Sequence, residues 1–64
     1  MEYPNIKVQL SGEDGNAFFI IGRVRAALKK GDVPYSRIDE FTNEAMDGDY
    51  NHVLQTCIKW VNVS

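Results

Sequence analysis

The spacing of hydrophobic residues predicts a short strand at the start of the chain. Ile6, Val8 and Leu10 alternate with polar residues within NIKVQLS (residues 5–11), which is the period of a half-buried strand. Pro4 precedes this segment, as expected for the start or the edge of a strand. The chain ends with WVNVS, which also alternates. This pattern fits either the end of a helix or a short C-terminal strand paired with the first one.

A helical period follows from Ala17 to Lys30. At about 100° per residue, the side chains of one arc are all apolar, and they are Ala17, Ile20, Ile21, Val24, Ala27 and Leu28. Asn16, or Asp14 just before it, can cap the first N–H groups of this helix. Gly31 is expected to end it.

A second helix is expected within DVPYSRIDEFTNEAMDG (residues 32–48), with Pro34 in its first turn and Gly48 at its end. Ser36 and Asp39 have the spacing of a capping box. The predicted apolar side is made by Ile38, Phe41, Ala45 and Met46, with Thr42 among them. The predicted acidic outer side is made by Asp39, Glu40, Asn43, Glu44 and Asp47.

The third helix has the strongest periodic signal, and Asp49 is its expected N-cap. One wide apolar arc holds Tyr50, Val53, Leu54, Cys57, Ile58, Trp60 and Val61. The whole chain, residues 1–64, is therefore predicted to be one small, mostly α domain of the α+β type. A short N-terminal strand precedes a three-helix bundle. Its core is expected to contain Ile6, Val8, Leu10, Ile21, Val24, Leu28, Ile38, Phe41, Val53, Leu54, Cys57 and Val61, with Trp60 at the edge of its arc.

Composition narrows the classes of function. The chain has 7 basic and 9 acidic residues and a net charge of −2, a balance that favours neither a nucleic-acid binder nor an acidic mimic of nucleic acid. A single cysteine, Cys57, forms no internal disulfide. The longest apolar run, residues 17–21, is far shorter than a membrane span. No signal peptide is visible after Met1, so a cytoplasmic location and no membrane partner are expected.

Three motifs suggest chemistry, and each has a simpler explanation. SGEDGN lacks the Lys of a phosphate-binding loop, and its acidic residues repel anions, so it is best interpreted as a turn that leads into the helix. Asp47, Asp49 and Asn51 match the first ligands of a calcium-binding EF-hand. His52 and Ile58, however, stand where that loop needs Gly and Glu. His52 and Cys57 fall on opposite faces of the third helix. We therefore expect no enzyme, cofactor or metal site.

The first helix has a second surface opposite its core stripe. It consists of aromatic, small and basic residues, and the candidate interaction surface is Phe18, Phe19, Gly22, Arg23, Ala26 and Lys30. Arg25 and Lys29 lie on the other flank. Three interpretations are open. The phenylalanines could be covered by the strand or another helix, or the surface could bind a protein partner or a second copy, with the acidic second helix meeting the basic rim. Alternatively, the basic rim, Phe and Trp60 could bind nucleic acid.

LSGEDGNAFFIIGRVRAAL and GDYNHVLQTCIKWV are similar to segments of short, uncharacterised proteins of bacteria and their phages. The resemblance extends from Ile6 to Val63. It implies an autonomous small domain and brings no activity, ligand or site residues. From the residues themselves, we expect a small non-enzymatic protein-interaction module that associates with itself. A nucleic-acid-binding accessory protein is the alternative.

Overall fold

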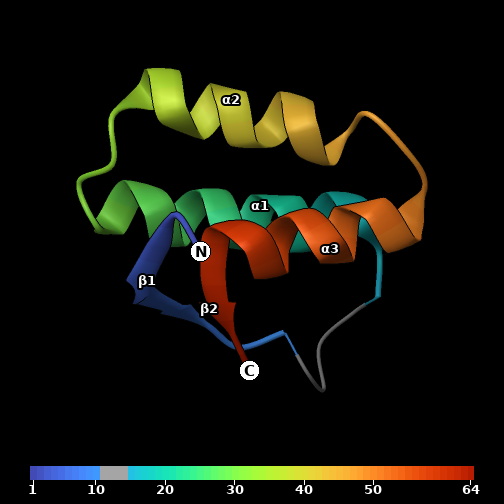
Figure 1. Cartoon of the computed structure of the whole chain (residues 1–64), viewed down its shortest axis with the longest axis horizontal. Coiled ribbons are helices and arrows are strands. Elements are labelled where there is room, and N and C mark those ends of the chain that lie inside the picture. The colour runs from blue at the N-terminus through green and yellow to red at the C-terminus, as the bar shows by residue number, and fades with distance from the viewer. Residues whose placement is uncertain (11–14) are drawn as a thin grey trace.

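A computed structural model describes residues 1–10 and 15–64 of the chain (Figure 1). Its elements, in chain order, are β1 (Tyr3–Val8), α1 (Ala17–Lys30), α2 (Tyr35–Ala45), α3 (Tyr50–Trp60) and β2 (Val61–Val63). The small, mostly helical α+β fold expected from the sequence is confirmed, and the alternating chain end is a strand.

The two strands come from opposite ends of the chain and pair in parallel. Parallel strands need a long crossover connection, and here all three helices form it. Figure 1 shows α2 on one side of α1 and α3, with the sheet on the other side. β1 begins at Tyr3, earlier than predicted. An irregularity of register between Tyr3 and Lys7 allows Tyr3 and Ile6, which would face opposite sides of a regular strand, to pack against the same core.

The core lies between the helices and the sheet. Most predicted core residues are buried, whereas Ile6, Leu10 and Leu54 are only partly buried and pack against its edge. Trp60 was placed at the edge of its arc, but it is 2% exposed and lies at the centre. Its ring stacks on Tyr3 with centroids 6.0 Å apart and meets Phe41 edge to face at 5.6 Å. The core also contains Ile20, Val33 and Ala45.

Two helix starts follow the predicted caps and one does not. The Asn16 side chain accepts the N–H groups of Phe18 and Phe19 at 2.9 and 3.3 Å. Asp49 accepts the N–H of His52 at 2.9 Å. The predicted capping box of α2 is wrong, because the helix begins after Pro34 without a side-chain cap. Asp14, the alternative cap of α1, lies outside the described residues, as does most of SGEDGN.

The apolar arcs predicted for α2 and α3 are too wide. Met46, Tyr50 and Ile58 were assigned to the apolar sides of these helices, yet all three are exposed. α2 ends at Ala45, before the predicted stop at Gly48. The neighbouring elements cover only part of each arc, so the residues at its margins remain in solvent.

Gly31 allows β1 to approach the end of α1. A β-carbon added at Gly31 would lie 2.8 Å from Cδ1 of Ile6, well inside van der Waals contact. The Gly31 N–H donates to the carbonyl of Ala27 at 3.0 Å and closes the last turn. Left-handed backbone appears one residue later, at Asp32 (φ 62°). The close approach at Gly31 therefore brings the end of α1 directly against β1.

Candidate interaction surface

The solvent-facing side of α1, here called the outer face, carries Phe18, Phe19, Gly22, Ala26, Lys29 and Lys30, all exposed. The opposite side of the helix holds the buried residues Ile20, Ile21, Val24 and Leu28. Because the core stripe is anchored on α2, α3 and β1, the orientation of the outer face is fixed by packing.

The two phenylalanines are the most unusual part of this face. Phe18 is 73% exposed and Phe19 is 42% exposed. The interpretation in which both rings are covered by the strand or another helix is therefore wrong. Large aromatic side chains that remain in water beside one another are typical of surfaces that bind a partner.

Small residues lie between the aromatic and basic parts of the outer face. A β-carbon added at Gly22 would meet no neighbouring atom within 4 Å, and Ala26 is exposed one turn further on. Side chains of this size allow the backbone of a second helix to approach α1 closely.

The basic residues of α1 divide into an engaged pair and an exposed pair. Arg23 is half-buried, and its Nε donates to the carbonyl of Gln9 at 2.9 Å, so it ties α1 to the end of the strand segment. Arg25 donates to Thr42 and lies 3.6 Å from Asp39. Lys29 and Lys30 are exposed, and no carboxylate of the described residues lies within ion-pair distance of either.

Two hollows adjoin α1, and sequence reasoning found neither. One, of about 260 Å³, lies between α1 and α2 and is lined by Arg25, Ala26, Lys29, Tyr35 and Ile38. The other, of about 180 Å³, lies at the start of α1 and is lined by Ala17, Phe18, Ile21, Met46, Gly48, Asp49, Tyr50 and Val53. The only sequence signal for the first hollow is Tyr35, an aromatic residue outside the core arc of α2. The ammonium group of Lys29 lies 5.8 Å from the centroid of the Tyr35 ring. This contact depends on the tertiary fold and could not be predicted from the sequence.

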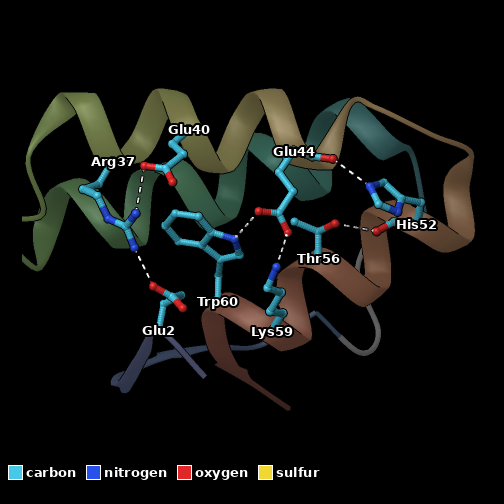
Figure 2. Close-up of polar contacts among 8 residues, drawn as sticks. All are labelled: Glu2, Arg37, Glu40, Glu44, His52, Thr56, Lys59 and Trp60. Carbon is cyan, nitrogen blue, oxygen red and sulfur yellow. Dashed lines mark hydrogen bonds and ion pairs between the residues drawn. The ribbon is translucent and has the colours of Figure 1, made fainter.

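The polar residues between α2 and α3 are engaged with one another and do not form an open site (Figure 2). Arg37 lies 4.6 Å from the centroid of the Trp60 ring and pairs with Glu2 and, at 2.8 Å, with Glu40. It also donates to the Tyr3 hydroxyl at 3.2 Å, and this bond and the one to Glu40 raise the pKa of Arg37. Arg37 therefore covers the core tryptophan.

Glu44 forms the other end of this seam (Figure 2). It accepts hydrogen bonds from Lys59 at 3.0 Å and from the indole N–H of Trp60 at 3.3 Å. These bonds, chiefly that from Lys59, lower the pKa of Glu44. Glu44 was predicted on the acidic outer side of α2 but is half-buried. The other members of that predicted side, Asp39, Glu40, Asn43 and Asp47, are exposed.

Three of the residues that suggested catalysis or metal binding, namely Cys57, His52 and Asp49, have structural roles. Cys57 is fully buried, and burial raises the pKa of its thiol to about 11. The Nε2 atom of His52 lies 2.7 Å from the Glu44 carbonyl and is engaged there. Asp49 is occupied as a helix cap. Within residues 1–10 and 15–64, no group of three ligating side chains gathers as a metal site would require.

Comparison of the chain with protein-family models, curated proteins and solved structures finds no match. The resemblance to short bacterial and phage proteins therefore stays a prediction. Among the described residues, no helix combines the length and the apolar character needed to cross a membrane.

Proposed function

We propose that this chain is a small, non-enzymatic protein-interaction module that binds a second copy of itself through the outer face of α1. The exposure of Phe18 and Phe19 beside Gly22 and Ala26 is the observation that carries the proposal. Aromatic rings supply large apolar contact area, and small neighbours let another backbone come close enough to use it.

A second copy is favoured as the partner for two reasons. Closed two-fold dimers are the commonest oligomers. The exposed Lys29 and Lys30 of one copy also have a complement on the other, because Asp47 is exposed just after α2. Asp39 and Glu40 are exposed on α2 itself, beside their partners Arg25 and Arg37. A domain of 64 residues has a small core, and association adds burial that the monomer lacks.

The expected dimer is weak. α1 has 14 residues, so its face is about 21 Å long and about 10 Å wide, a contact at the low end of protein interfaces. We expect a dissociation constant of roughly 1–100 µM.

The nucleic-acid alternative has less support. Trp60 is buried beneath Arg37, so its ring cannot stack on a base. Arg23 and Arg25 are held by contacts within the fold. This leaves Lys29 and Lys30 as the exposed cations of the predicted rim, too few for tight binding to phosphates.

Sedimentation equilibrium of the whole chain over about 5–500 µM, at low and moderate salt, tests the proposal. We expect a reversible dimer that moderate salt leaves intact. Phe18→Asp and Phe19→Asp should each weaken association at least about tenfold. Each substitution removes an aromatic contact and places a carboxylate in the buried interface. Ile58→Asp is the matched control, since Ile58 is an exposed apolar residue on α3.

A monomer at all concentrations would overturn the proposal, as would equal weakening by the Ile58 control. Titration of a labelled 20-nucleotide single strand and a duplex into the same protein separates the alternative. Binding that falls steeply with salt and is lost in Lys30→Glu would favour the nucleic-acid function.

A further inference from the structure

The charges of α1 are confined to its last eight residues. The first six, AFFIIG, carry no charge, whereas the last eight, RVRAALKK, carry four cations, and neither segment contains an acidic residue. A parallel pair of α1 helices would place the cations of both copies beside one another. An antiparallel pair places Lys29 and Lys30 of each helix against the uncharged first turns of the other, which reduces this repulsion. Arg23 and Arg25 remain near the crossing, where Gln9 and Asp39 hold them.

The outer face of α1 is also self-complementary about its midpoint, which lies at the level of the buried Val24 along the helix axis. Gly22 and Ala26 lie at equal distances on either side of this point. A two-fold axis there would bring Gly22 of one copy against Ala26 of the second, so the small residues would meet at the crossing.

The same axis pairs aromatic with basic side chains. At about 100° per residue, Phe18 and Lys29 lie on the flank of α1 that faces α2, whereas Phe19 and Lys30 lie on the other flank. In an antiparallel pair, each Phe would therefore meet the corresponding Lys of the second copy. Phenylalanine rings pack well on the apolar stem of lysine and attract its ammonium group.

The hollow between α1 and α2 lies where the Phe18 ring of a second copy would arrive. This hollow, of about 260 Å³, is lined by Lys29, Tyr35 and Ile38 together with Arg25 and Ala26. Lys29 already lies over the Tyr35 ring. Arg25 is held in place by Asp39 and Thr42. The most exposed aromatic ring of the chain would thus enter a preformed site that offers an aromatic wall and two cations.

Resting on the proposed function, we propose that two copies associate through antiparallel α1 helices, with Phe18 of each copy seated in the hollow between α1 and α2 of the other. In this arrangement, Tyr35 of each copy becomes part of the interface.

Disulfide mapping with two single variants, Gly22→Cys and Ala26→Cys, tests the arrangement. The two proteins carry tags of different mass and are mixed in equal amounts and oxidised at a concentration where the wild type is dimeric. The native Cys57 is retained because its thiol is fully buried. Antiparallel helices bring position 22 of one copy within disulfide reach of position 26 of the other, so the mixed species should exceed either homodimer at least about fivefold. Sedimentation of the reduced variants shows whether each still dimerises.

Predominant homodimers would indicate parallel helices and overturn the arrangement. Absence of any disulfide in a sample that sediments as a dimer would also overturn it and leave the proposed function standing. Absence of the wild-type dimer would overturn both.

A second pair of variants lies on α2, away from the residues at which the two α1 helices would cross, and tests the seating of Phe18. Tyr35→Ala removes one wall of the hollow and should weaken dimerisation about fivefold or more. Ser36→Ala, at the neighbouring exposed position on α2, should leave it unchanged. Circular dichroism melting establishes that both variants are folded. An equal effect of the two, or none from Tyr35→Ala, would refute the seating of Phe18.

Discussion

The contact between Gly31 and Ile6 makes a prediction that can be worked from the structure. In Gly31→Ala, the new β-carbon would lie 2.8 Å from Cδ1 and 3.3 Å from Cγ1 of Ile6. Overpacking of this kind costs about 1–3 kcal/mol. The added methyl group also restricts the unfolded chain, which favours folding by about 0.4–1 kcal/mol. The net expectation is a loss of about 1 kcal/mol.

Ile6→Val removes the closer of the two clashing atoms. Alone, it should cost about 0.5–1 kcal/mol, because Ile6 is only half-buried. In the Gly31→Ala protein it should cost almost nothing, since the deleted methyl group is the one that clashes. The two substitutions are therefore expected to be coupled by about 1 kcal/mol, so that the double variant is about as stable as either single one.

Urea denaturation followed by tryptophan fluorescence measures this cycle. Trp60 is the single tryptophan and is buried between Tyr3 and Phe41, so its emission reports the whole fold. The protein is kept at about 1 µM, at or below the expected dissociation constant of the dimer. Additivity of the two substitutions within about 0.3 kcal/mol would refute the reasoning, because it would show that the strand moves away from Gly31 without cost.

Three further predictions concern backbone strain and pH. Asp32→Gly should stabilise the protein by about 0.5–1 kcal/mol in the same assay. Relief of left-handed strain, about 1–2 kcal/mol, exceeds the freedom that glycine adds to the unfolded chain, about 0.4–1 kcal/mol, and an unchanged midpoint would contradict this. The folded-state pKa of Glu44 is lowered, so the free energy of unfolding should fall as the pH drops below about 5, and less steeply in Glu44→Gln. The pKa of Cys57 is raised from 9.0 to about 11, so stability should be lost as the pH rises through that window; an equal decline in Cys57→Ala would contradict it.

Local patterns predicted the helices well. Asn16 and Asp49 cap the helices that follow them because an N-cap acts only on the next turn. The central position of Trp60 was not predictable, because it depends on the packing of Tyr3 from β1 and Phe41 from α2 against the same indole ring. The pairing of β1 with the last strand was one of the two interpretations of WVNVS, and the structure confirms it, whereas the parallel direction of the pair was not predicted.

The outer face was predictable because α1 is apolar on two sides, and a helix in a small domain has only one core to face. Its exposure was not, because the phenylalanines could equally have met another element. The hollow beside Tyr35 was missed for a related reason. Its size depends on the distance between α1 and α2, which the side chains of both helices set together.

The parallel pairing of β1 with β2 has a kinetic consequence. Val8 pairs with Val63 across almost the whole chain, so this contact closes a long loop and carries a large entropic cost. The helices can form from local contacts, whereas the sheet cannot, and we expect it to form after the folding transition state. Val8→Ala or Val63→Ala, which shortens the side chain, should then increase the unfolding rate and leave the folding rate nearly unchanged. A folding rate that fell in proportion to the lost stability would show instead that the chain ends meet first.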